Sequence, residues 1–467
     1  MALDPDRLTS IDEFGDRTYI IPAEVRGFFH KHRQRVHILL LFIFLILPWT
    51  SINGQQTILL DIPARKFSLF GITFWAHDAP LVFFVLATLT LGLAFVTSVW
   101  GRVWCGWACP QTVFIEAVFR RIETWVQGNY IQRRQLHQAP LSFSKAFKKS
   151  LTWFLFLVVS SLIAHSFVAY FVGSRELIQM IQGSPEENWS YFVIVTAMTL
   201  LVLFDFGWFR EQFCIIMCPY GRFQSVLLDQ KSLGVIYDEE RGEPRKGKTA
   251  PGQKQGDCVA CNRCVQVCPT GIDIRKGLQM ECIACTACID ACDEIMEKVK
   301  KPKGLIRYDT FDRSAFSLKK PRSLVYMALI TFALAGLAYN IVTREKAQVF
   351  VLRAKEAPYT LIKGAQGEDL ILNHFRLEIQ NQGFKKASYR LTPPAEWQEK
   401  GIEMTVAQNP VAVEPGQFFE WHVFVRFKPD VVAEQGKFTT QVKLQDENDL
   451  ESPFSSEKEF ILVGPKK

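Results

Sequence analysis

Long apolar runs are the feature that most limits how this chain can fold. Four of them are long enough to cross a bilayer core about 30 Å thick: residues 79–101, 151–173, 190–209 and 323–343. A fifth run, residues 36–49, is shorter and ends at Pro48. It begins too far from Met1 for a signal peptide and no small-residue cleavage site follows it, so we interpret it as a retained helix. The sequence therefore predicts a bundle of five transmembrane helices.

The basic residues beside these runs predict the orientation. The 102–150 loop carries eight Lys or Arg residues against two acids, whereas loops 50–78 and 174–189 carry two and one basic residues. Short loops rich in Lys and Arg stay on the cytoplasmic side. The net charge of +7 follows from this bias and gives no support to nucleic-acid binding. The expected order is a cytoplasmic segment (1–35), four membrane helices (36–209), a cytoplasmic region (210–322), a fifth helix (323–343) and an exported domain (344–467).

Eight of the twelve cysteines form a tandem C-x2-C-x2-C-x3-C pattern within about residues 250–300. This spacing is typical of two-cluster bacterial ferredoxins, in which the fourth Cys of each run binds the other cluster. Structural zinc sites usually show C-x2-C pairs separated by a longer loop. We therefore expect two [4Fe–4S] clusters, the first on Cys258, Cys261, Cys264 and Cys292, and the second on Cys282, Cys285, Cys288 and Cys268.

The other four cysteines form two C-x3-C-P motifs, each after a pair of predicted spans: Cys105, Cys109, Cys214 and Cys218. The two motifs are offset by 109 residues, which indicates an internal duplication. Thiols at i and i+4 of a helix share one face, and soft thiolates favour Cu(I) or an iron–sulfur cluster. Together the four could bind copper, hold a third cluster or cycle between dithiol and disulfide. The alternative is that they are buried packing residues.

Three further residues in or beside the spans could carry chemistry. His37 and His165 could ligate a haem, but single helical histidines are more often hydrogen-bonded packing residues, so haem is not expected. Asp205 lies near the cytoplasmic end of the fourth run, where an intramembrane acid is a functional candidate. A solvated carboxylate at the interface is the alternative reading.

The segment after the last apolar run alternates apolar and polar residues with a period of two. Phe375, Leu377 and Ile379 repeat in this way, as do Val423 and Val425. Six or seven short strands over about 120 residues predict a small β-sandwich. This segment contains no Cys, so we expect a docking module there and no redox centre.

The motifs together resemble the cytochrome c oxidase accessory proteins, the family called CcoG, FixG or RdxA. The resemblance rests on the stretches WCGWACPQT (104–112), CIDACD (288–293) and KGLIRY (303–308), the tandem ferredoxin pattern and the β tail. Asp293 departs from the usual Pro after the last ferredoxin Cys. The resemblance implies a bacterial inner-membrane polyferredoxin with a periplasmic immunoglobulin-like domain. It further implies that the protein reduces Cu(II) to Cu(I) for assembly of cbb-type haem–copper oxidases.

Under this reading, electrons pass from an unidentified cytoplasmic donor through the two clusters to copper at the four C-x3-C-P thiols. The expected partners are the membrane, copper ions and oxidase assembly factors or copper transporters. Two other functions stay open. One is a quinol-linked membrane ferredoxin of the respiratory nitrogen-oxide type, for which Cu(II) would be a poor acceptor. The other is a non-catalytic scaffold that binds copper or oxidase subunits.

Overall fold

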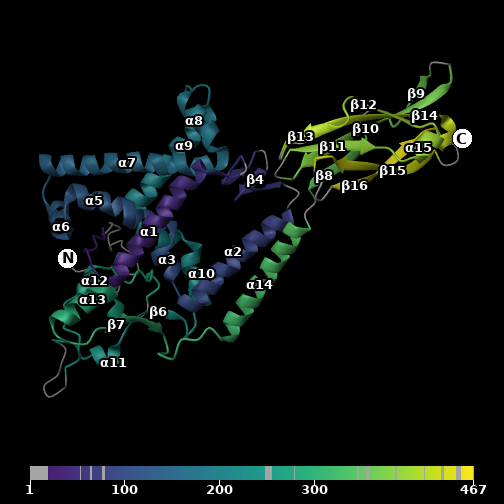
Figure 1. Cartoon of the computed structure of the whole chain (residues 1–467). Coiled ribbons are helices and arrows are strands. Elements are labelled where there is room, and N and C mark those ends of the chain that lie inside the picture. The colour runs from purple at the N-terminus through teal and green to yellow at the C-terminus, as the bar shows by residue number, and fades with distance from the viewer. Residues whose placement is uncertain are drawn as a thin grey trace. The chain divides into compact units, whose positions relative to one another are not determined.

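The computed structural model describes residues 19–52, 54–63, 66–75, 79–247, 255–277, 279–343, 346–353, 357–364, 367–383, 386–414, 416–432, 436–448 and 454–465. The chain divides into two compact units, Met1–Ala338 and Tyr339–Lys467 (Figure 1). The first 18 residues of the predicted 1–35 segment lie outside the described ranges.

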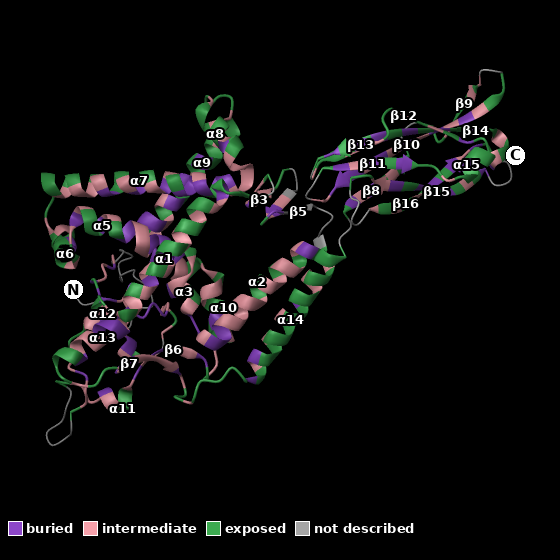
Figure 2. Cartoon of the chain, in the orientation of Figure 1, coloured by how far each residue is buried: buried purple, intermediate pink, exposed green. Residues whose placement is uncertain are grey.

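The four longest apolar runs are confirmed as helices. They are α2 (Ala79–Trp100), α7 (Phe143–Val172), α9 (Trp189–Val202) with its π-helical continuation η4 (Leu203–Phe209), and α14 (Pro321–Val342). Each is long and apolar enough to cross a membrane. Figure 2 shows α14 exposed along most of its length, and Phe332 on it is 72% exposed. Such a surface is suited to contact with lipid.

The first helix differs from the prediction. Helix α1 spans Phe28–Ile46 and continues as a short 3-10 turn, η1 (Leu47–Trp49). It therefore begins eight residues before the apolar run, and its polar first half contains the buried residues Arg33 and His37. By length and composition, four of the described helices could span a membrane, and α1 is not among them.

The connections between these helices contain elements that the sequence did not predict. The 50–78 loop forms a hairpin, β1 (Ser51–Ile52) with β2 (Gln55–Gln56), and a three-stranded sheet in the order β3 (Ile58–Asp61), β4 (Lys66–Leu69), β5 (Ile72–Trp75). Helix α8 (Ser174–Gln182) follows α7. The 102–150 loop folds into α3 (Val103–Trp107), α4 (Pro110–Phe114), the π-helical η3 (Ile115–Phe119), α5 (Arg120–Gln127) and α6 (Tyr130–Gln138).

The cysteine-rich region is enclosed by two strands. Strands β6 (Leu233–Tyr237) and β7 (Ile306–Thr310) pair antiparallel at its two ends. Ile274, Ile289 and Met296 pack with these strands in one buried core. The remaining elements are a π-helical turn η5 (Phe213–Met217), α10 (Pro219–Leu227), α11 (Glu239–Gly242), α12 (Arg263–Gln266), the 3-10 turn η6 (Ile274–Lys276) and α13 (Ala287–Lys298).

The second unit consists of two antiparallel sheets around one apolar core. One sheet has the order β12–β14–β10–β8 with β9 also paired to β10, and the other has the order β13–β11–β15–β16. Trp397 and Trp421 are almost fully buried in the shared core. The strands are β8 (Ala347–Arg353), β9 (Thr360–Lys363), β10 (Asp369–Asn381), β11 (Ala387–Thr392), β12 (Glu403–Val406), β13 (Val411–Val413), β14 (Phe418–Phe427), β15 (Lys437–Asp446) and β16 (Ser455–Val463), with α15 (Glu396–Glu399) between β11 and β12.

This unit has nine strands in its described part, more than the six or seven predicted. The additional strands are short, and β9 and β13 have four and three residues. A strand of that length shows too few alternating positions for the period of two to be recognised.

The N-terminus of α1 is capped by a residue distant in sequence. The backbone N–H groups of Phe29 and His30 donate to the Asp290 carboxylate on α13, at 3.2 and 2.7 Å. Gly27 precedes the helix and provides no side-chain cap. A carboxylate at this position satisfies two free N–H groups and interacts favourably with the helix dipole.

We predict that Asp290→Ala destabilises the first unit by about 1–2 kcal/mol, the usual value for loss of a helix cap. The midpoint of thermal unfolding in detergent should fall while the iron content stays constant. Glu294→Ala on the same helix is the matched control, because its ion pair with Lys298 is exposed and contributes little. Equal midpoints for the two variants would contradict the capping role.

Candidate metal centre

Two small cavities lie in the cysteine-rich region, and cysteines line both. The first lies between β6, α12 and α13 and has an empty volume of about 350 Å³, which includes space open to solvent. Its walls include Cys258, Cys261, Cys264 and Cys292. Three of these thiols come from the first run, and the fourth comes from the end of the second.

The second cavity has an empty volume of about 360 Å³, which again includes space open to solvent. Cys282, Cys285 and Cys288 line it together with Cys268 from the first run, and Cys264 borders it as well. The walls of the two cavities therefore show the same crossed grouping as the spacing-based assignment. Ligation of iron by these eight residues stays a prediction.

The backbone explains how three nearby thiols face one cavity. Both runs place the residues on either side of their middle Cys in the left-handed region, at Ala260 and Asn262 and again at Ala284 and Thr286. Each such non-glycine residue costs about 1–2 kcal/mol. The repeated pair turns the chain tightly around the cavity, and the fourth Cys of each run lies beyond that turn.

The chemistry of these cavities fits an iron–sulfur cluster. Burial raises the pKa of Cys264, Cys282 and Cys292 to about 12, so these thiols stay protonated until a cation replaces the proton. As the side chains are placed, no three Cys, His, Asp or Glu residues of the described part converge at ligating distance. The assignment of the eight cysteines to two groups therefore rests on which cavity each of them lines.

The C-x3-C-P motifs do not form single helices, contrary to the prediction that their thiols share one helix face. Cys105 lies on α3, whereas Cys109 has extended backbone and precedes Pro110, the first residue of α4. Cys214 and Cys218 show the same arrangement before α10. Proline at the first position ends one helix and starts the next, because it has no N–H and its φ is fixed.

The two motifs nevertheless have matching conformations and lie near each other. The N–H of Cys109 donates to the carbonyl of Trp104, and that of Cys218 to the carbonyl of Phe213, both at 2.8 Å. The Cys105 thiol lies 3.5 Å from the Gln224 Oε1 atom on α10. Burial raises the pKa of Cys105 to about 12, and the proximity of Cys109 and Cys218 contributes to the increase. The duplication therefore places the four thiols in one neighbourhood.

The first thiol motif touches the loop of the second cavity. A Cβ atom added at Gly106, between Cys105 and Cys109, would lie 2.5 Å from the Ile283 carbonyl oxygen and 2.9 Å from the Cys285 backbone nitrogen. Only glycine allows two backbones to approach this closely. The membrane-side thiols and the ferredoxin thiols therefore form one continuous region.

Buried arginines hold this region together. Arg33 on α1 donates to the Cys285 carbonyl at 2.8 Å, and Arg102 donates to the Cys282 carbonyl at 3.2 Å. Arg120 on α5 donates to the carbonyl of Pro269, directly after Cys268, at 3.2 Å. Arg102 and Arg120 belong to the basic 102–150 loop, whose charge predicts the orientation. The sequence shows that these residues are basic. It does not show their hydrogen-bond partners, because every residue has a backbone carbonyl.

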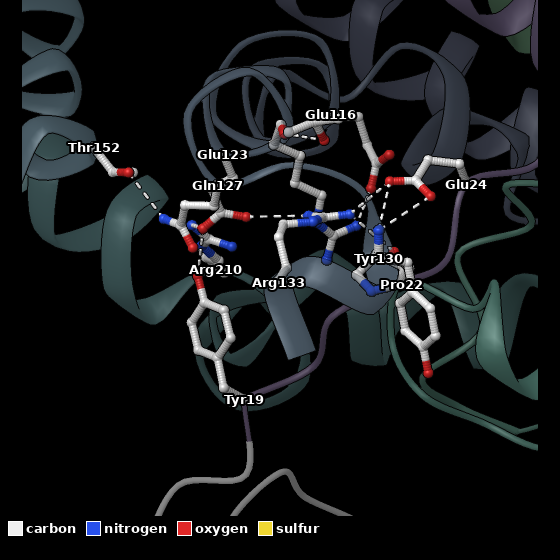
Figure 3. Close-up of polar contacts among 12 residues, drawn as sticks. Tyr19, Pro22, Glu24, Glu116, Glu123, Gln127, Tyr130, Arg133, Thr152 and Arg210 are labelled. Carbon is white, nitrogen blue, oxygen red and sulfur yellow. Dashed lines mark hydrogen bonds and ion pairs between the residues drawn. The ribbon is translucent and has the colours of Figure 1, made fainter. Parts of the chain in front are cut away.

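A second buried network connects the N-terminal segment to the helices (Figure 3). Glu123 on α5 accepts from Arg210 at 2.6 Å and from the Tyr19 hydroxyl at 2.9 Å, and it lies 3.5 Å from Arg133. Arg133 also pairs with Glu24 at 3.2 Å. Arg210 is only 1% exposed. A buried charge of this kind requires its partner.

Each of the three other candidate residues contacts a polar group of the protein. His37 lies with its Nε2 3.3 Å from the Gly106 carbonyl oxygen, and His165 lies with its Nδ1 2.8 Å from the Ser161 carbonyl oxygen. Asp205 on η4 accepts from the Gln111 side chain at 2.9 Å. Gln111 follows the first C-x3-C-P motif, so Asp205 helps to position α4.

Comparison with known proteins identifies the parts of the chain. Residues 209–311 match the 4Fe-4S dicluster domain family, and residues 81–130 match a 4Fe-4S binding domain family. Residues 337–465 match the Ig-like fold at the C-terminus of FixG. Protein RdxA of Cereibacter sphaeroides is 32% identical over 422 residues, which cover 85% of this chain and 88% of RdxA. The chain belongs to the FixG/RdxA family.

Two further relatives agree with this placement. Protein RdxB of Cereibacter sphaeroides is 34% identical over 84% of this chain and 85% of RdxB. The nitrogen fixation protein FixG of Rhizobium meliloti is 29% identical over 86% of each chain. With its ferredoxin-type domains and its four apolar helices, this member of the FixG/RdxA family is a membrane iron–sulfur electron-transfer protein.

We predict that Gly106→Ala displaces the loop of the second cavity, because the added methyl group meets backbone atoms that cannot rotate away. Iron per chain should fall from about eight atoms toward the about four of a single cluster. Gly92→Ala on α2 is the control, since a Cβ there has nothing within 4 Å. Equal iron content in the two variants would rule out the close approach.

We also predict that the Glu123 network makes the first unit sensitive to acid. Burial by itself would raise the pKa of Glu123, but Arg210, Tyr19 and Arg133 hold that pKa below its usual range. The resulting stability is complete above the unfolded carboxyl pKa of about 4.3 and is lost as the pH falls through the lower folded pKa.

The variant Glu123→Gln should lower the free energy of unfolding by about 3–5 kcal/mol at pH 7, because Arg210 then stays buried without the Glu123 carboxylate. The loss should shrink as the pH falls below about 4, and thermal unfolding across pH measures this. Glu297→Gln is the control, because its pair with Lys303 is exposed. A loss that does not change with pH would contradict the assignment.

Proposed function

We propose that this protein reduces Cu(II) to Cu(I) at Cys105, Cys109, Cys214 and Cys218, and that the Cu(I) serves assembly of a cbb-type haem–copper oxidase. The observation that carries the proposal is the backbone contact of Gly106 with Ile283 and Cys285. It joins the four-thiol neighbourhood to the loop that would hold the second cluster. Electron transfer weakens steeply with distance, so this contact supports transfer between the two centres.

Two sets of cysteines would have different roles, one in electron transfer and one in copper binding. The eight ferredoxin cysteines would hold two [4Fe–4S] clusters, which supply electrons one at a time at potentials between about −700 and +450 mV. Reduction of Cu(II) to Cu(I) takes up one electron. The four soft thiols bind Cu(I) better than harder ligands do, and so favour the reduced product.

The proposed topology places this chemistry at the cytoplasmic face. The apolar second half of α1 would be a fifth membrane segment, and its residues Leu39 and Phe42 are 57% and 60% exposed. With five crossings and the basic 102–150 loop inside, the ferredoxin region is cytoplasmic and the Ig-like unit is periplasmic in a bacterial inner membrane. Its electron donor would then be a cytoplasmic reductant, and copper transporters or oxidase assembly factors would be its partners.

The proposal predicts that replacing all four C-x3-C-P cysteines by serine lowers the rate of Cu(I) formation at least tenfold. The test is anaerobic purification with chemically reduced clusters, followed by addition of Cu(II) and a Cu(I)-selective chelator. About eight irons per chain should remain in the variant. Cys261→Ser is the contrasting variant, because it should lose iron first and activity as a consequence.

Three results would point elsewhere. Unchanged Cu(I) formation in the four-serine variant would exclude these thiols as the copper site. A wild-type content of about twelve irons that falls to about eight in the variant would make the four thiols ligands of a third cluster. Cluster reduction by quinol together with slow reaction with Cu(II) would favour the quinol-linked carrier.

A further inference from the structure

Two histidines lie side by side on the outer face of the Ig-like unit. His374 is on β10 and His422 is on the neighbouring β14, where they pair with Phe424 and Arg376 respectively. The two histidines are therefore diagonal neighbours on one face of the sheet. Phe375 and Val423, next to them in sequence, point into the core, so both imidazoles point outward.

The distance between the two rings fits a shared metal ion. The Nε2 atom of His374 lies 2.9 Å from the Nδ1 atom of His422. Imidazole nitrogens bind zinc at about 2.0–2.1 Å, and two bonds of that length at a right angle place the nitrogens about 2.9 Å apart. A right angle between ligands is typical of the square-planar sites that Cu(II) prefers.

Neighbouring side chains contact both rings. Phe424 stacks on the His374 ring, with centroids 4.3 Å apart and planes 16° apart. Glu420 has its Oε1 atom 3.7 Å from the Nε2 atom of His422, which is the ring nitrogen that does not face His374. This distance is too long for a hydrogen bond, but it places a negative charge beside the outer nitrogen of the ring. Arg376 in turn lies 3.4 Å from Glu420 and positions this carboxylate.

We propose that His374 and His422 form a binding site for a divalent transition-metal ion, with Cu(II) as the preferred ion. Neutral imidazole suits copper and zinc, and the general order of divalent affinities is highest at Cu(II). The site is separate from the cysteine region, because no Cys is present in residues 344–467. The inference depends on the proposed function only for the physiological identity of the metal.

The test uses the full-length protein in detergent, with Cys105, Cys109, Cys214 and Cys218 replaced by serine and with its clusters kept oxidised. Cu(II) is titrated, and bound copper is followed by electron paramagnetic resonance. We expect one Cu(II) per chain with hyperfine coupling to two nitrogens. His374→Phe and His422→Phe, each added to this background, should lower the affinity more than about tenfold, and the double variant should bind no more weakly than either single one.

His32→Gln is the matched control, because it removes an imidazole that contacts the Phe28 ring in the other unit. It should leave the Cu(II) signal unchanged. Cu(II) binding that is equal in the His422→Phe variant and its parent would overturn the proposal. An absence of two-nitrogen coupling would also overturn the proposal, and the two histidines would then be a hydrogen-bonded pair without a metal.

The two proposals fail separately. In a chain with all cysteines intact, His374→Phe should leave the thiol-dependent reduction of Cu(II) at wild-type rates when copper is supplied in excess. Loss of Cu(I) formation in the four-serine variant with the two-nitrogen signal retained would support both. The two-nitrogen signal with no cupric reduction in the wild type would remove the proposed function and keep the site.

Discussion

The arrangement of the first unit depends on hydrogen bonds from buried arginines to the carbonyl groups of the ferredoxin loops. Arg33, Arg102 and Arg120 come from three different places around the helices, and each donates to a carbonyl at or directly after a cysteine of the second cavity. A charged donor forms a stronger hydrogen bond than a neutral one. These contacts hold the loop near α3, where Gly106 allows the two backbones to approach closely.

The same arginines place positive charge next to the thiols. A [4Fe–4S] cluster held by four thiolates is an anion, and hydrogen bonds and charge around a cluster set its potential. Arg33 and Arg102 therefore support the loop and also lie beside the predicted cluster ligands. Glu116 lies within 4 Å of both Arg33 and Arg120, so part of this positive charge is balanced inside the protein. Substituting either arginine would change the fold and the redox chemistry together.

Several parts of the architecture could be predicted because their signals are local. The four long apolar helices follow from length and hydropathy, and the alternation along β10 and β14 follows from a sheet with one buried face. The start of α1 could not be predicted, because its cap is Asp290, about 260 residues away. The break inside each C-x3-C-P motif had a visible signal in Pro110 and Pro219, which favour a new helix start.

The sequence alone predicts which residues carry the chemistry. The spacing of eight cysteines predicts two groups of four, because a short turn can present only three thiols to one cavity, and the repeated C-x3-C-P motif predicts a second thiol centre. Tertiary structure decided how these centres meet. The contact at Gly106, the arginine anchors and the pairing of His374 with His422 join segments that are 48 to about 250 residues apart. Such contacts depend on how whole elements pack, and no periodicity or spacing in the chain records them.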